Sequence, residues 1–323
     1  MVQVLDSGTR EFRPPDPDGF REWVRENKSR ELKNKVISER EAVERYVADG
    51  DYLCIECCYT NRGPNSLLRE IVRQRKKDLW LAGRFMYFDA TILIGAGCVS
   101  KLDVGYFGLG RSLHKAIETG KVKTVEWSNG AMTMRLLAGA MGAPFAPVRF
   151  LGGTDAFRNS GAKLIEDPFT GKPVVLLPAL NPDVAIIHAH QCDVYGNARV
   201  FGTSVSPKDV AMASRKVIVS AEEIIDAEET RRNPGLTTIP YYFVDAVVDA
   251  PFGSHPGTMP GLYGSDTEHI IELMMLANAD KIETYLDKYI YSVETQQQYL
   301  EQRVGLAKLL QFKRNEVIKE GYR

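Results

Sequence analysis

Three residues of types that bind metals occupy alternate positions in one short stretch of the sequence. His188, His190 and Cys192 lie within NPDVAIIHAHQCDVYGN, at the end of an apolar run. If this run is a strand, alternation places the three side chains on one face. They then span about 13 Å, at roughly 3.3 Å per residue, which is too far for one ion. The sequence therefore predicts no metal here and a strand end that hydrogen-bonds locally.

Other segments with suggestive residue types give weak signals. GYFGLG, residues 105–110, has neither the G-x-G-x-x-G spacing of dinucleotide loops nor the Lys-Ser ending of phosphate loops. LGGTD, residues 151–155, is a lone glycine pair, which is more typical of a tight turn. The sequence has no G-x-S-x-G pattern, the central feature of α/β-type serine hydrolases. None of these motifs identifies a reaction by itself.

Charge and composition exclude several classes of function. The chain has 41 basic and 42 acidic side chains, a net charge of -1, and no basic stripe, so electrostatic binding to nucleic acid or to an anionic membrane has no support. No signal-peptide core and no run of about eighteen apolar residues occur. Five cysteines, three of them in CIECC, are an odd number without a secretion signal. The sequence predicts a cytoplasmic protein with reduced thiols.

The elements that must position these residues alternate between helices and strands. SEREAVERY begins with Ser38 and Glu41 in capping-box spacing, which predicts a helix start. The strand YLCIECC and the helix SLLREIVRQRKK follow, and the apolar pieces DLWLAG, TILIGAG and DVGYFG precede a helical AMTMRLLAGAMG. The continuously apolar later segments predict strands covered on both faces of a mainly parallel sheet. They are PVVLLPAL, DVAIIHAH, KVIVSAEEII and FVDAVVDA.

The chain divides into three parts. Residues 1–34 are polar and too poor in apolar side chains to form a core, so we expect an extension that packs on a partner or on the main body. Residues 35–290 contain the alternating elements of the main domain. Residues 291–323 have a helical pattern and are expected to serve packing or assembly.

Several motifs, each weak alone, occur in one order that resembles a known family. The resemblance is to the alpha subunit of family I coenzyme A transferases, of the glutaconate CoA-transferase type, and it covers roughly residues 35–290. It implies the α/β fold of that family, an open, mainly parallel sheet with helices on both faces. The segments that carry it are EWSN, GAPFAPVR, LGGTD, DPFTGKPVVLLPALNPDVAIIHAHQCDVYGNARVFG, VIVSAEEII, VDAVVDAPFGSHPG and GLYGSD.

The resemblance implies covalent catalysis with a partner chain. In the family a glutamate attacks an acyl-CoA thioester, an acyl anhydride forms, and the released CoA returns to give a glutamyl-CoA thioester. A carboxylate suits this role because it resembles the substrate acids as a leaving group. In two-chain members this glutamate lies on the beta subunit. The resemblance implies no bound cofactor and no metal, because the CoA thioester and a carboxylic acid are substrates.

Two candidate substrate-binding residues lie where the sequence departs from the family. Family alpha chains carry a Gly-Gly-Phe-like loop after the first strand, whereas this chain has CIECCYTNRGP. One interpretation is a bulkier loop that packs on the partner chain. The alternative is that Glu56 or Arg62 enters an altered acyl pocket.

Further candidates lie in EWSN and GSHP. Glu126 is either a carboxylate that favours a helix start, with Ser128 or Asn129 as the cap, or a catalytic group, because some ring-opening relatives use an acidic residue of the alpha chain near this region. Ser128 and Asn129 are candidate substrate-binding residues. His255 is either a turn histidine satisfied by backbone or part of the pocket. His269 fits a helical surface pattern and is assigned no function.

The sequence thus predicts the alpha subunit of a heteromeric CoA-transferase that works with a beta subunit. The alternative on the same fold is a CoA-thioester ring-opening hydrolase or decarboxylase. A second alternative is a protein that binds CoA esters without catalysis.

Overall fold

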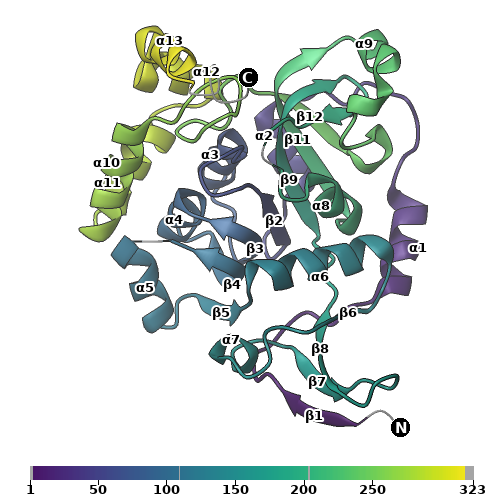
Figure 1. Cartoon of the computed structure of the whole chain (residues 1–323). Helices are drawn as coiled ribbons and strands as arrows, with labels where there is room; N and C mark the ends of the chain where they lie inside the picture. The colour runs from purple at the N-terminus through teal and green to yellow at the C-terminus, as the bar shows by residue number, and fades with distance from the viewer. Residues whose placement is uncertain (1–2, 109, 203, 317–323) are drawn as a thin grey trace.

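The centre of the molecule is an open parallel sheet with helices on both faces (Figure 1). The computed structural model describes residues 3–108, 110–202 and 204–316. Seven of the described strands pair in the order β12-β11-β9-β2-β3-β4-β5, all parallel, which confirms the predicted fold class. They are β2 (Tyr52–Glu56), β3 (Leu79–Met86), β4 (Val99–Phe107), β5 (Lys123–Glu126), β9 (Val184–Asp193), β11 (Lys216–Ile225) and β12 (Ala246–Asp249).

The order of the strands reverses between β2 and β9. From β2 the chain builds outward through β3, β4 and β5, and it later returns to the other side of β2 with β9, β11 and β12. Leu53 pairs with Val184 and Ile55 with Ile186 at this junction. In open α/β sheets, ligands bind beyond the carboxyl ends of the strands at such a reversal. The fold therefore directs the search for a site to the ends of β2 and β9.

Alternation along the buried strands builds one core on each face of the sheet. In β2, Leu53 and Ile55 face one core while Tyr52 and Cys54 face the other. The first core is covered by α2 (Glu39–Tyr46), α3 (Asn65–Arg73), α4 (Phe88–Gly95), α5 (Gly110–Glu118), α10 (Thr267–Asn278) and α11 (Ile282–Leu286). The second is covered by α6 (Asn129–Met141), which crosses the front of the sheet in Figure 1, and by α8 (Pro207–Ala213).

Two local expectations had different outcomes. Ser38 accepts a hydrogen bond from the Glu41 N–H, and the Glu41 carboxylate accepts one from the Ser38 N–H, so the predicted capping box of α2 is confirmed. The apolar piece TILIGAG instead forms most of α4, because it is short and periodicity does not separate a buried helix from a buried strand.

A small antiparallel sheet lies beside the main domain, in the order β1-β7-β8-β6. PVVLLPAL, expected as a strand of the parallel sheet, belongs here as β8, so that expectation was wrong. The short turn between Asp167 and Lys172 closes a hairpin, and such a turn permits only antiparallel pairing. The strands are β1 (Val4–Ser7), β6 (Phe145–Val148), β7 (Lys163–Glu166) and β8 (Pro173–Pro178), with the short α7 (Asp155–Arg158) before β7.

The described part of the extension lies on the main body. β1 pairs with β7, and α1 (Pro17–Asn27) packs beside α6 and α8 (Figure 1). Ion pairs from Arg13 to Asp183 at 2.6 Å and from Lys28 to Asp245 at 2.8 Å hold it on either side of α1.

Short elements complete the described chain, and none of its helices is both long and apolar enough to cross a membrane. β10 (Ala198–Arg199) pairs antiparallel with the end of β9. The others are α9 (Ala227–Arg232), α12 (Gln296–Tyr299), α13 (Leu306–Arg314), the 3-10 turns Pro234–Leu236 and Tyr241–Phe243, and the π-helical turns Asp287–Tyr291 and Leu300–Val304.

Candidate functional site

A buried charge cluster lies where β2 and β3 end. Glu56 is the last residue of β2, and its carboxylate accepts two hydrogen bonds from Arg62, at 2.8 and 3.1 Å. Arg84 of β3 places Nη2 3.7 Å from the same carboxylate, while its Nη1 donates to Thr133 Oγ1 at 3.3 Å. Burial by itself would lower the pKa of the Arg62 guanidinium, but the charge of Glu56 and its hydrogen bonds to Arg62 raise that pKa above its ordinary value. The structure thus brings the two candidate residues Glu56 and Arg62 together as a fully buried ion pair.

The loop after β2 is held in a strained conformation. Tyr59 and Arg62 both have φ near +60°, in the left-handed region that costs a non-glycine residue about 1–3 kcal/mol. The Arg62 N–H donates to the Thr258 carbonyl at 2.9 Å, which fixes this loop against a distant segment of the chain. Burial raises the pKa of Cys54 to about 12 and that of Cys57 well above its ordinary value. These cysteines are therefore thiols near neutral pH, and they are not nucleophiles.

A hydrogen-bonded chain of side chains joins the ends of β9 and β11 to the segment around residue 260. The His188 ring lies between Ser220, with Nδ1 2.8 Å from the hydroxyl, and Glu222, with Nε2 2.7 Å from the carboxylate. Tyr263 donates its hydroxyl to the same Glu222 oxygen, and the Phe252 N–H donates to the other oxygen at 2.7 Å. Ser220 is fully buried, so this Ser–His–Glu chain presents no nucleophile to a substrate.

His190 is a neutral wall residue. Its Nδ1 accepts a hydrogen bond from the Phe201 N–H at 3.1 Å, and its Nε2 donates to the Pro260 carbonyl at 2.9 Å. Burial lowers the pKa of His190, so the ring stays uncharged near neutral pH. Both ring nitrogens of His188 and of His190 are occupied by hydrogen bonds, and neither ring is free for a metal. The turn that follows forms as expected, since Asp193 accepts three backbone N–H bonds.

A pocket of about 330 Å³ opens beside this chain, at the carboxyl ends of β9 and β11. It lies next to the charge cluster, because Arg62 and His190 bond to the carbonyls of Thr258 and Pro260. The location agrees with the reversal of strand order at β2 and β9. Its lining residues are His190, Gln191, Phe201, Glu222, Glu223, Pro251, Phe252, Leu262, Tyr263 and Lys313.

The candidates from EWSN lie elsewhere on the same sheet edge. Glu126 ends β5, three strands from β2, which is about 14 Å at roughly 4.8 Å per strand. Its carboxylate accepts a hydrogen bond from Asn159 at 3.3 Å and is half-buried. Ser128 caps α6 by accepting from the Ala131 N–H at 3.1 Å, and Asn129 begins that helix. Asn129 is linked to the charge cluster through Thr133, whose hydroxyl donates to the Asn129 carbonyl at 3.0 Å and accepts from Arg84. None of the three residues bonds directly to Glu56, Arg62 or Arg84 among the bonds described.

His255 is buried in a cluster and does not line the pocket. Its Nδ1 lies 2.8 Å from the Tyr299 hydroxyl and its Nε2 3.3 Å from Asp266. His269, expected on a helix surface, is also buried and bonds to Tyr285. That expectation was wrong because α11 and the following turn cover this face of α10, a contact that periodicity within α10 does not reveal.

The same cluster has residue types that could hold a metal ion. Potential ligand atoms of His255, Asp266 and His269 all lie within 4.8 Å of one another. The Lys308 ammonium is 4.0 Å from Asp266, and Arg69 donates to the His255 carbonyl. The hydrogen bonds within the cluster, with Lys308 near its one carboxylate, lead us to interpret it as structural.

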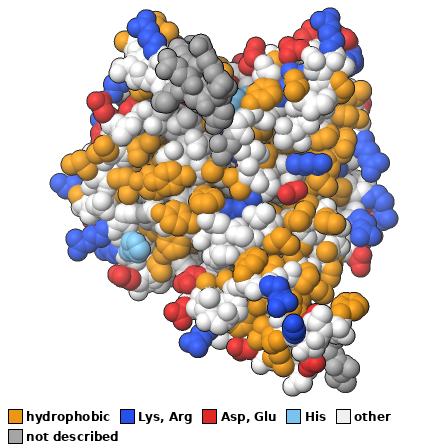
Figure 2. All heavy atoms as spheres, viewed as in Figure 1, with side chains coloured by type: hydrophobic (Ala, Val, Ile, Leu, Met, Phe, Trp, Pro, Cys, Tyr) orange, Lys and Arg blue, Asp and Glu red, His pale blue; other side chains and the backbone are white. Residues whose placement is uncertain are grey.

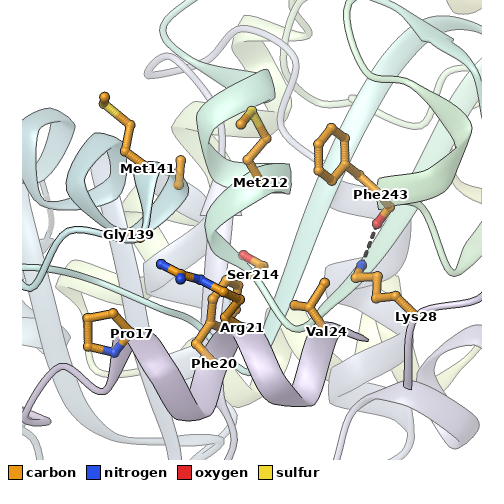
Figure 3. A pocket seen from close by; sticks show the side chains of 12 residues that line it. Pro17, Phe20, Arg21, Val24, Lys28, Gly139, Met141, Met212, Ser214 and Phe243 are labelled. Carbon is orange, nitrogen blue, oxygen red and sulfur yellow. Dashed lines mark hydrogen bonds between the residues drawn. The ribbon is translucent and has the colours of Figure 1, made fainter. Parts of the chain in front are cut away.

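A second pocket, of about 220 Å³, lies at the opposite edge of the sheet (Figure 3). Phe20 and Val24 of α1 face Met212 and Phe243 across it, and Lys28 donates to the Phe243 carbonyl. It adjoins the amino end of β11, where ligands of open α/β sheets do not bind.

Sequence reasoning missed Arg84 and Glu222, and it gave Tyr263 no role beyond its place in the GLYGSD segment. A signal for Glu222 was present, because two carboxylates interrupt the apolar run KVIVSAEEII near its end, where a buried strand delivers polar groups to the sheet edge. Arg84 carried no comparable signal, since its contacts depend on segments distant in the sequence.

Comparison with known proteins places this architecture in a family. The sequence profile of the family described as "Coenzyme A transferase" matches residues 36–250. The chain belongs to the coenzyme A transferase family. In this coenzyme A transferase homologue, both the charge cluster and the His188–Glu222 chain lie within or beside the matched region.

Two related sequences and one crystal structure illustrate the relationship. The A subunit of the glutaconate CoA-transferase of Acidaminococcus fermentans is 31% identical over 304 residues, covering 87% of this chain and 95% of that protein. The corresponding chain of the 3-oxoadipate CoA-transferase of Pseudomonas knackmussii is 35% identical, covering 79% and 93%. The crystal structure of the Acidaminococcus fermentans glutaconate CoA-transferase superposes with a TM-score of 0.81 over 86% of this chain and 95% of that chain, at 30% identity.

Relatives with other activities are also similar to this chain. The IpdA subunit of the cholesterol ring-cleaving hydrolase of Rhodococcus jostii is 30% identical, covering 64% of this chain and 75% of that protein. The crystal structure of a variant of the decarboxylase AibA/AibB has a TM-score of 0.69 over 79% of this chain and all of that chain, at 30% identity. Membership of the family therefore establishes a chain of the alpha-subunit type and leaves the reaction to be assigned.

Proposed function

We propose that this chain is the alpha subunit of a CoA-transferase and that the nucleophilic glutamate is supplied by a partner beta subunit. The observation that carries the proposal is that the two buried carboxylates beside the strand reversal already accept hydrogen bonds at both oxygens. Glu56 is bidentate to Arg62, and Glu222 accepts bonds at both oxygens, from His188, Tyr263 and the Phe252 N–H. Neither of these two buried carboxylates is free to attack a thioester, which supports a nucleophile supplied by another chain.

The proposed reaction moves CoA in two half-reactions. The partner's glutamate attacks the acyl-CoA carbonyl, CoA thiolate leaves, and an acyl-glutamyl anhydride forms. The thiolate then attacks the glutamyl carbonyl and releases the first acid, which leaves a glutamyl-CoA thioester. A second carboxylate runs the same steps in reverse. This chain binds the acyl part and keeps water from the anhydride.

The surface supports a partner chain. In Figure 2, hydrophobic side chains form patches across the middle of one face, while charged side chains gather toward its outline. Met141 is 73% exposed, and Phe145, Phe150 and Tyr106 are each more than 40% exposed. Exposed apolar patches of this kind are typical of protein interfaces. The two CoA-transferase relatives, each one chain of a two-chain enzyme, agree with this assignment.

The experiment is a covalent trap. The chain, co-purified with its beta subunit, is incubated with a panel of acyl-CoAs, reduced with borohydride and analysed by peptide mass spectrometry. We expect a reduced glutamate on the partner chain and no transfer by this chain alone. Transfer by the isolated chain, or labelling of Glu56 or Glu222, would overturn the assignment.

The alternative is a ring-opening hydrolase or decarboxylase, and one observation favours it. Glu126 is half-exposed at the end of β5 and makes only a 3.3 Å bond to Asn159 among the described residues, so this carboxylate is available for acid–base work. Consumption of a CoA ester with no marked glutamate, abolished by Glu126→Gln, would support this alternative.

A further inference from the structure

In the pocket beside His190, the buried polar side chains already use their hydrogen-bonding atoms on partners within the protein, unlike those of an ordinary polar substrate site. His190 uses one nitrogen as acceptor and the other as donor. Glu222 has both oxygens engaged, and Tyr263 donates to Glu222 while it accepts from the Ser254 N–H at 3.1 Å. A polar ligand group placed deep in this pocket would lose its bonds to water without gaining a partner from these three side chains.

The remaining walls are apolar. Phe252 and Tyr263 lie ring to ring, with centroids 4.6 Å apart, and the Phe201 ring lies 5.3 Å from His190. Phe201 and Leu262 are 38% and 40% exposed, so they offer apolar surface that a ligand can cover. Phe252 also has φ of +53°, a left-handed conformation, and its N–H bond to Glu222 helps to hold it there.

Apart from the buried Glu222, the charged residues that line the pocket are exposed. Lys313 is exposed and places its ammonium 5.4 Å from the centre of the Phe252 ring. Glu223 is exposed too, and it accepts a hydrogen bond from Gln191 at 2.8 Å. These charges remain in water, and the interior is uncharged at His190 because burial keeps that ring neutral.

The size of the pocket sets the size of the ligand. An apolar cavity of about 150 Å³ holds one benzene molecule, and this pocket is roughly twice as large, at about 330 Å³. A two-carbon acyl group would leave most of it empty. A six-membered ring with a short linker to the thioester would fill it.

We propose that this pocket binds an apolar acyl group of about the size of a ring, such as an aryl-acetyl or cycloalkyl-carbonyl group, as the acyl part of the CoA substrate. The proposal rests on the proposed function for the thioester chemistry. The pocket adjoins the charge cluster at the strand reversal, so an acyl group in it directs its thioester toward the edge where the partner's glutamate acts.

The test compares acyl-CoAs with the complex of this chain and its beta subunit. The probes are acetyl-CoA, succinyl-CoA, benzoyl-CoA and phenylacetyl-CoA, each measured for kcat/KM and, by equilibrium dialysis, for Kd. We expect phenylacetyl-CoA to exceed acetyl-CoA at least tenfold in kcat/KM and in affinity, which corresponds to burial of about 55 Å² of apolar surface. A Kd for acetyl-CoA or succinyl-CoA equal to or below that of phenylacetyl-CoA overturns the proposal, even if no transfer occurs.

Matched variants test whether the preference for phenylacetyl-CoA arises in this pocket. Leu262→Ser and Phe201→Ser should each weaken phenylacetyl-CoA binding about fivefold while leaving acetyl-CoA within about twofold. Leu236→Ser, at a comparably exposed leucine outside the pocket, should change neither. If the pocket variants affect all probes equally, the pocket does not select the acyl group. If dialysis shows the preference but no transfer occurs with any probe, the pocket assignment stands and the transferase assignment fails.

Discussion

The ion pair between Glu56 and Arg62 yields a sharp prediction, because both side chains are fully buried and bonded to each other twice. Glu56→Gln keeps the volume of the side chain but removes its charge. Arg62 would then remain as a buried cation with a weaker acceptor, and Arg84 would lose a carboxylate 3.7 Å away.

The size of the effect follows from the burial. Removing one partner of a buried ion pair costs about 3–5 kcal/mol, much of it the penalty of the charge left behind. For a chain of this length, that loss lowers the unfolding temperature by about 4–7 °C. An exposed carboxylate on the same sheet edge should behave differently, so Glu223→Gln should stay within about 0.5 kcal/mol of the parent.

The assay is equilibrium unfolding in urea, followed by circular dichroism, for Glu56→Gln, Arg62→Gln and the double variant. We expect the double variant to lose less free energy of unfolding than the two single variants lose in sum, with a coupling energy above about 1 kcal/mol. A loss below about 1 kcal/mol for Glu56→Gln, together with zero coupling, would refute the reasoning. Glu56 would then be free for the acyl pocket, and its substitution should change the preferred acid instead.

Three further predictions concern pH, capping and thiol chemistry. Burial lowers the pKa of His190 in the folded protein. As the pH falls below about 6.5, this histidine takes up a proton in the unfolded chain before it does so in the folded chain. The free energy of unfolding is therefore highest above about pH 6.5 and falls at lower pH. Urea midpoints measured between about pH 7.5 and 5 should fall, less steeply in His190→Gln, and an unchanged slope would contradict the assignment. Ser128→Ala should cost about 1 kcal/mol through loss of the α6 cap, while Ser128→Thr should retain most of it; a large loss of turnover at unchanged stability would instead indicate substrate binding. Iodoacetamide should leave Cys54 and Cys57 unlabelled in the folded protein and label both in urea, and rapid native labelling of either would show a reactive thiolate.

Local patterns in the sequence were sufficient for part of the fold. The capping box at Ser38 and Glu41 and the strand that ends at Asp193 depend on neighbours a few residues away, and both are confirmed. The antiparallel pairing of residues 173–178 was not predicted. An apolar run is equally compatible with either sheet, and the partner strand decides between them.

The sequence singled out Glu56 and Arg62 as candidate substrate-binding residues but did not predict that they pair. Glu56 and Arg62 are six residues apart in one unusual loop, and they do meet. The pocket could not be predicted, because it depends on Glu222, Phe252 and Tyr263, which are brought together by tertiary hydrogen bonds. Similarly, the burial of His269 follows from a helix that lies later in the chain.

The pairing of β1 with β7 has a consequence for biosynthesis. Val4 pairs with Ile165, about 160 residues further along the chain. At a synthesis rate of roughly 5–20 residues per second, β1 leaves the ribosome some ten to thirty seconds before its partner. All four residues of β1 are exposed even in the folded protein, so β1 buries little apolar surface when it pairs with β7. The small sheet can therefore close only after synthesis has passed β8, which ends at Pro178.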